Sequence, residues 1–208
     1  MKINKIKALC KREVHCMIYA QGGGCLIGTR NAVYPAGELK INRRTIATLF
    51  DWPDVEGDIA VEEAVWTDSR NYPSEMGYSS EQELKAGGVL TYTGDEVRPL
   101  VTEGMNGTIY FVLEDYLTAA EKTEGYTVYS LAHNAEGEPL IVVGDGMITT
   151  AIVRPLPKKT AANIRTYLQG IAELIACGWP DEDKTEKPDE LDGQIEMESM
   201  LREMEDET

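Results

Sequence analysis

The stretch TIYFVLEDYLTAAEKTEGYTVYSLAHNAEGEPLIVVGDGMITTAIV, residues 108–153, decides the fold. Its β-rich start, residues 108–113, passes into a helical spacing of apolar residues at Leu113, Leu117 and Ala120. Three more β-rich runs follow, separated by turn sequences: 126–132, 140–143 and 147–153. Turn chemistry at each joint favours antiparallel pairing of neighbouring strands. We therefore expect a strand, a helix and three further strands, in this order.

Residues 1–35 follow the same order without the opening strand. Apolar residues recur at helical spacing at the start of the chain and predict a helix over residues 3–12. A glycine turn then joins two apolar runs, 14–20 and 25–29, which predicts a hairpin, and residues 32–35 predict a third strand. The chain thus uses a helix-plus-three-strand unit twice. We expect an α+β fold with a mainly antiparallel sheet.

Two further helices are predicted outside these units. Asn42 is a good N-cap for a helix that has Ile46 on its apolar side, and Pro53 forbids an extension of that helix. The longest helix, at the C-terminal side, is expected to begin near Thr160 and to end before Gly178. Its apolar positions step along one face: Ile164, Leu168, Ile171 and Ile175.

Residues 53–99 form an irregular, acidic excursion, with eleven acids against three basic residues. Strands are expected within it at 59–65 and 89–93. Its aromatic residues, set among serine, proline and glycine, favour a long excursion of one domain over a separate domain. These aromatic residues are Trp66, Tyr72 and Tyr78. We therefore expect a single domain over residues 1–180, followed at 181–208 by a flexible or partly helical tail with thirteen acids and three bases.

The charge of the chain is unevenly distributed. Thirty-six acidic and twenty basic residues give a net charge of −16, which by itself argues against polyanionic partners. Ten of the basic residues nevertheless fall in three segments that hold a single acid: 1–12, 41–50 and 157–177. Because these segments are predicted helices, we expect them to present one basic face to phosphate groups. The residues predicted to contact nucleic acid are Lys5, Lys11, Arg12, Arg43, Arg44, Lys158, Lys159 and Arg165.

Several classes of function are not indicated by the sequence. No apolar run approaches the roughly 20 residues of a membrane span, and the lysine-rich start lacks a secretory signal, so we expect a cytoplasmic protein without membrane contact. The four cysteines show no zinc spacing, and reduced thiols are expected. Cys25 follows three glycines, and only His15 and His133 are candidate bases for such a thiol. A hairpin turn explains the glycines, so we expect no catalytic residue, metal or cofactor.

Two resemblances can be stated from these residues. The stretch GCLIGTRNAVYP at residues 24–35, followed by a helix that ends at Leu49-Phe50-Asp51, resembles uncharacterised proteins encoded by bacteriophages and prophages of Gram-positive bacteria. The twice-used helix-plus-three-strand order, with VVGDG at residues 142–146, is similar to the repeating unit of DNA polymerase sliding clamps. That likeness implies a clamp-like fold whose helices turn basic side chains toward DNA. A bacterial clamp subunit has three such domains, whereas this chain has room for about one.

Two hypotheses about function lead at this stage, and an enzyme remains a third option that no residue pattern supports. In the first, the chain is a non-catalytic phage-type accessory protein, a clamp-like nucleic-acid-processing or assembly module that works through its basic helices. Its partners would be DNA or a replication or assembly protein, together with further copies of itself. In the second, it is a protein-binding or structural phage component without a nucleic-acid role, in which the charges only solubilise the helices.

Overall fold

The computed structural model describes residues 2–21, 24–37, 39–52, 59–65, 82–104, 107–120 and 125–177. The chain divides into two units, Met1–Ala162 and Asn163–Thr208. Several sequence predictions lie outside the described residues: the aromatic residues Trp66, Tyr72 and Tyr78 and the acidic tail at 181–208.

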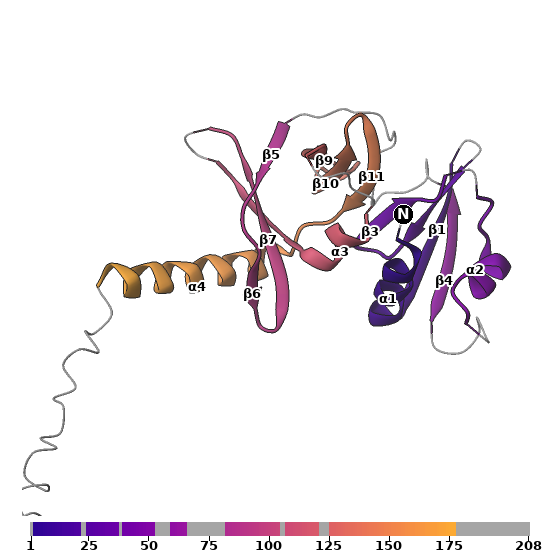
Figure 1. Cartoon of the computed structure of the whole chain (residues 1–208), viewed down its shortest axis with the longest axis horizontal. Helices are drawn as coiled ribbons and strands as arrows, with labels where there is room; N and C mark the ends of the chain where they lie inside the picture. Colours follow the sequence, from indigo (N-terminus) through magenta and orange to yellow (C-terminus); the bar gives the residue numbers. More distant parts are fainter. Residues whose placement is uncertain are drawn as a thin grey trace, which may run out of the picture. The chain divides into compact units, whose positions relative to one another are not determined.

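Four helices and eleven strands make up the described residues (Figure 1). The helices are α1 (Ile3–Glu13), α2 (Arg43–Leu49), α3 (Glu114–Ala119) and α4 (Lys158–Ala176). The strands are β1 (His15–Gln21), β2 (Gly24–Gly28), β3 (Ala32–Pro35), β4 (Ala60–Val65), β5 (Gln82–Ala86), β6 (Leu90–Tyr92), β7 (Asp95–Thr102), β8 (Ile109–Leu113), β9 (Thr127–His133), β10 (Pro139–Asp145) and β11 (Ile148–Val153). No described helix is both long enough and apolar enough to cross a membrane.

All eleven strands belong to one sheet, which is mostly antiparallel. Their order is β4-β1-β2-β3-β11-β10-β9-β5-β7-β6, and β8 pairs with β7. The hairpin of β1 and β2 places Ile18 opposite Ile27, whereas β4 runs parallel to β1. The two parts of the sheet that come from the predicted units are joined by the antiparallel pair of β3 and β11, where Val33 lies opposite Ile152. The predicted α+β class with a mainly antiparallel sheet and a C-terminal helix is confirmed.

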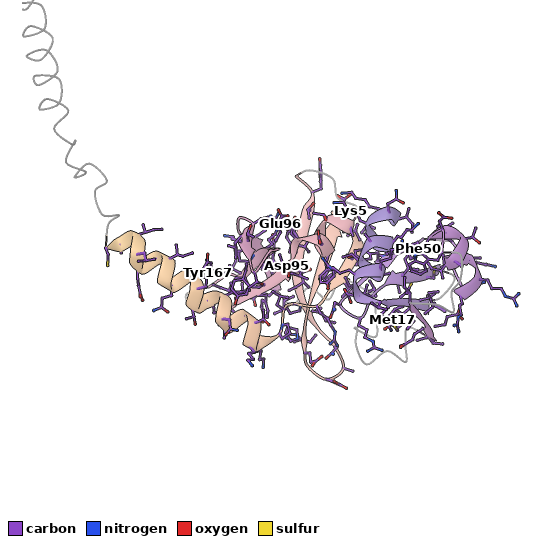
Figure 2. All side chains as sticks on the ribbon, turned by 90° about the horizontal axis from the view of Figure 1, so that it is seen from below. Lys5, Met17, Phe50, Asp95, Glu96 and Tyr167 are labelled. Atoms are coloured by element: carbon purple, nitrogen blue, oxygen red, sulfur yellow. The ribbon has the colours of Figure 1, made fainter. Side chains whose placement is uncertain are left out.

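The strand pleat sorts the apolar side chains of the sheet onto two faces. On one face, Cys16 and Ile18 of β1 are buried in the same cluster as Ile6 of α1, Ile46 of α2 and Leu117 of α3. The other face carries a second buried cluster, made of Met17, Tyr19, Leu26, Val33, Ala132, Leu140 and Ile152. Figure 2 places Lys5 and Met17 on opposite sides of the molecule, with Phe50 between them. Helices α1, α2 and α3 therefore share one face of the sheet, which we call the helical face.

Two strands were not expected from the sequence. Strand β5 reads QELKA and strand β7 reads DEVRPLVT, and both contain too many charges to suggest a buried sheet. Pro99 in β7 has no N–H to donate to a neighbouring strand. The pairing of β7 with β5 ends at Leu100, which lies opposite Ala86, so Pro99 lies just beyond the last paired position. There its carbonyl accepts a hydrogen bond from the Gly87 N–H at 2.9 Å. Part of the predicted irregular excursion is thus regular sheet.

Candidate nucleic-acid interface

Helix α1 buries one side and turns its basic side chains to the other. Ile6, Leu9 and Cys10 are buried against the sheet, and Lys5 and Lys11 are exposed. No acidic residue stands in its first turn, and Lys11 and Arg12 occupy its last turn, where positive charge complements the helix dipole. Because the apolar residues recur at helical spacing on the buried side of α1, Lys5 and Lys11 lie on its solvent-exposed side.

The exposed side of α1 has two flanks. With 100° of turn per residue, Lys5 and Arg12 fall on one flank, and Lys7 and Lys11 fall on the other. Lys5 and Arg12 line a hollow of about 250 Å³ together with Asp115 of α3. The first flank thus faces α3, and the second flank faces away from it.

Arg12 is neutralised on the α3 side. Its Nη1 lies 2.6 Å from Oδ2 of Asp115, and its guanidinium carbon lies 5.6 Å from the centre of the Tyr116 ring. Tyr116 in turn donates a hydrogen bond of 2.7 Å from its hydroxyl to Oε1 of Glu13. Burial, reinforced by Glu13, raises the pKa of the Tyr116 hydroxyl. These contacts join α1 to α3, so we assign Arg12 a structural role before a binding role.

Helix α2 presents two basic residues in its first turn. A capping box starts the helix: the Asn42 side chain accepts from the Thr45 N–H at 3.0 Å, and the Thr45 hydroxyl oxygen accepts from the Asn42 N–H at 2.8 Å. Arg43 and Arg44 are exposed and line an open hollow of about 570 Å³, together with Glu63 of β4. The Arg43 backbone N–H donates to the Glu63 carboxylate. Among the described residues that line this hollow, Glu63 is the acid.

The order of the helices on the helical face brings two of these groups toward each other. Helix α2 contacts β4, α1 contacts β1 and β2, and α3 contacts β11. Because β4, β1, β2, β3 and β11 follow one another in the sheet, α1 lies between α2 and α3 (Figure 1). The Lys7 and Lys11 flank, which points away from α3, therefore points toward α2. We call Lys7, Lys11, Arg43 and Arg44 the basic helix pair.

Helices α1, α2 and α3 hold three acids between them. Helix α2 holds none, and the acid of α1 is Glu13, at its last residue. Glu13 is held by Tyr116 and by the Asn31 side chain, whose Nδ2 donates at 2.9 Å. Helix α3 has Glu114 and Asp115 in its first turn. Their carboxylates are engaged by Arg98 and Arg12, respectively.

The remaining predicted residues lie elsewhere. Lys158 and Lys159 are exposed at the start of α4, which follows a backbone hydrogen bond of 2.7 Å from Leu156 to Phe111 of β8. Arg165 belongs to the second unit of the chain. The structure therefore gathers Lys11, Arg43 and Arg44 on one face, with Lys5 on the far flank of α1. The sequence prediction does not include Lys7, although residues four apart lie on the same side of a helix and Lys7 is four residues before Lys11.

Cys25, the thiol that follows the glycine turn, is buried. Cys25 Sγ lies 2.9 Å from the carbonyl oxygen of Leu39, and burial raises the pKa of this thiol. A thiol with a raised pKa is a poor nucleophile. Among the described residues, no group of three or more His, Cys, Asp or Glu side chains is placed to hold a metal ion.

Comparison with known proteins adds no assignment. The chain matches no protein-family model, no curated protein and no solved structure.

Proposed function

We propose that the chain is a non-catalytic accessory protein that holds nucleic acid against the basic helix pair. The observation that carries this proposal is the placement of Lys7, Lys11, Arg43 and Arg44 on two helices of one sheet face, in a chain of net charge −16. Lysine and arginine side chains that neutralise phosphates supply most of the affinity of sequence-independent binding. Lys11, Arg43 and Arg44 are exposed and Lys7 is half-buried, and cations held on helices fit that kind of contact.

The sheet order supports a clamp-like module. From the pair of β3 and β11 outward it reads β3-β2-β1 on one side and β11-β10-β9 on the other, and each of these three-strand sets is preceded in the chain by a helix, α1 or α3. The two helices contact each other. The two units are α1-β1-β2-β3 and α3-β9-β10-β11, and they join where their last strands, β3 and β11, pair. In keeping with the resemblance to phage proteins, we infer a role in handling a phage genome.

Charge reversal on α2 tests the proposal. We expect the double substitution Arg43→Glu/Arg44→Glu to weaken binding of a fluorescent DNA duplex by about tenfold or more at low salt, because two phosphate contacts become repulsions. Acidic residues in a first helical turn favour the helix dipole, so the fold should be kept. Fluorescence anisotropy of the full chain measures the affinity. The second double substitution, Lys7→Glu/Lys11→Glu, should act in the same direction.

The matched control is Arg30→Glu/Lys85→Glu, which makes the same change in net charge. Arg30 forms an ion pair with Glu62. Glu62 lies opposite Met17 in the pairing of β4 with β1, and Met17 belongs to the cluster on the other face of the sheet. Arg30 is therefore on the side of the sheet away from the helices. Lys85 pairs with Glu103 at the surface. This control should bind DNA nearly as the unchanged chain does. Equal losses in all three variants would mean that net charge alone matters, and the proposed interface would be wrong.

Removal of one acid should strengthen binding. Glu63→Gln keeps an oxygen that can accept the hydrogen bond from the Arg43 N–H but removes the charge that competes with phosphate. One unit charge about 4 Å away is worth ~1 kcal/mol in water, so we expect about fivefold tighter binding of the same duplex at low salt. A structural perturbation would not tighten binding. Unchanged or weaker binding would argue against phosphate contacts at α2.

One observation favours a second function, the binding of another protein. Tyr126, Met147 and Ile148 are 65%, 93% and 71% exposed, and a backbone hydrogen bond of 2.9 Å joins Gly146 to Tyr126. These residues form an apolar tip at the β10–β11 turn, and such tips occur in protein interfaces. If the full chain shows no anisotropy change with DNA at low salt, this second function becomes the better explanation.

A further inference from the structure

Strand β4 stands at one end of the strand order, and little apolar burial holds it there. Among the described strands it pairs with β1 alone, and the pairing is parallel. None of its six residues, Ala60–Val65, is buried. Segments with few buried apolar contacts open locally at a small cost in free energy, and parallel pairs are slightly less stable per residue than antiparallel pairs. A single polar contact can therefore change how firmly β4 is held to β1.

Such a contact comes from His15, the first residue of β1. Its side chain is 9% exposed, and its Nε2 lies 3.1 Å from Oε1 of Glu62 on β4. Among the described residues, neither ring nitrogen of His15 has a hydrogen-bond partner of good geometry. The contact with Glu62 is therefore mainly electrostatic, and its strength depends on whether the ring carries a second proton.

The charged groups beside His15 come from three neighbouring elements. Glu62 belongs to β4, Arg30 to the connection between β2 and β3, and Glu13 to the end of α1. The Glu13 carboxylate is already held by the two hydrogen bonds described above. Arg30 donates from Nη2 at 3.0 Å to Oε1 of Glu62, the same oxygen that the His15 ring approaches. Glu62 is thus shared between a permanent cation and a titratable ring.

The two opposite charges exist together in a limited range of pH. The contact with His15, and then that with Arg30, lowers the pKa of the Glu62 carboxyl below its usual 4.5. The stabilisation by the Glu62 charge is therefore lost only as the pH falls through that lowered pKa. A histidine ring loses its charge as the pH rises through roughly 5 to 8, and the stabilisation by that charge is lost there. Both charges are thus present at about pH 5–6.

We propose that His15 and Glu62 form a proton-dependent latch, in which a protonated His15 ring fastens strand β4 to β1 in mild acid and the loss of that proton loosens the strand. Arg30 still holds Glu62 when the ring is neutral, so β4 remains in the sheet at higher pH but opens more often. An opened β4 uncovers the backbone edge of β1, and such an edge pairs readily with other strands. This inference goes beyond the proposed nucleic-acid function and does not rest on it.

Hydrogen exchange of the full chain, measured at the amides of β4, tests the latch. Protection factors correct for the pH dependence of intrinsic exchange, and those of β4 should be about fivefold higher at about pH 5.5 than at about pH 8. Glu62→Gln should remove this difference, and so should His15→Gln. The matched control is His133→Gln, which removes the other histidine, exposed at the end of β9, and should keep the difference.

Two outcomes would overturn the proposal: equal protection of β4 at both pH values in the unchanged chain, or a difference that survives Glu62→Gln. The Glu62 side chain is 50% exposed, so this variant decides the matter even if His15→Gln does not fold. Arg30→Gln gives a further test, because the positive charge of Arg30 opposes protonation of the ring that shares its carboxylate. In this variant the difference should grow to about tenfold, and a smaller difference than in the unchanged chain would contradict the latch.

Discussion

Replacing Gly28 with alanine is expected to lower the free energy of unfolding by about 3 kcal/mol or more, because the added carbon has no room. A Cβ at this position would lie 2.0 Å from the Ala32 carbonyl oxygen and 2.9 Å from the Val33 Cα. Both are backbone atoms at the start of β3, and the Ala32 oxygen already accepts a hydrogen bond of 2.8 Å from the Thr29 N–H. Neither can move aside without disturbing the pairing of β2 with β3.

Urea denaturation followed by far-UV circular dichroism measures this loss. Gly170→Ala is the control, since no described atom lies within 4 Å of the position of its Cβ apart from its chain neighbours and the backbone of its own helix. In the interior of α4, alanine is favoured over glycine by about 1 kcal/mol, so the control should not destabilise. If Gly28→Ala unfolds at the same urea concentration as the unchanged chain, the described β2–β3 turn is wrong.

The second large effect is expected from Glu114→Ala. Glu114 is 7% exposed and receives two hydrogen bonds from Arg98, of 2.6 Å to Nε and 3.0 Å to Nη2. The hydrogen bond with Glu114 raises the pKa of the Arg98 guanidinium, which therefore stays charged. Removing one partner of a largely buried ion pair leaves the other charge without its partner, and because the Arg98 side chain is 24% exposed the expected cost is about 2–3 kcal/mol.

Asp115→Ala is the matched control for this prediction. Asp115 is the neighbour of Glu114 on α3, and its side chain is 62% exposed where it pairs with Arg12. Exposed pairs contribute about 0–1 kcal/mol, so the control should lose little. Equal losses for the two variants in the same denaturation experiment would contradict the assignment of Glu114 to the interior.

Local sequence signals account for much of the fold. The apolar spacing of α1, the glycine turn between β1 and β2, and the Asn42 cap each lie within a few residues of the element that they specify. The parallel pairing of β4 with β1 brings together residues about 45 positions apart, and no local pattern encodes it. Strand β7 was missed because its charged start and Pro99 are unfavourable in a strand, and pairing with β5 and β8 overrides that preference.

The candidate site was predictable only in part for the same reason. Helical spacing shows from sequence that Lys11, Arg43 and Arg44 point to solvent. It does not show that Arg12 forms an ion pair with Asp115, a residue 103 positions away, or that Glu63 lines the hollow beside α2. The adjacent acids Glu114 and Asp115 pair with two different arginines, Arg98 and Arg12, and no local sequence pattern shows which acid meets which.

The salt dependence of DNA binding by the full chain tests the central claim most directly. If each of the four residues of the basic helix pair neutralises one phosphate, the logarithm of the association constant should fall with the logarithm of the salt concentration with a slope of about −3.6. The Arg43→Glu/Arg44→Glu variant should show about half that slope or less. A slope near zero for the unchanged chain, or the same slope for both proteins, would show that helices α1 and α2 do not bind the phosphate backbone.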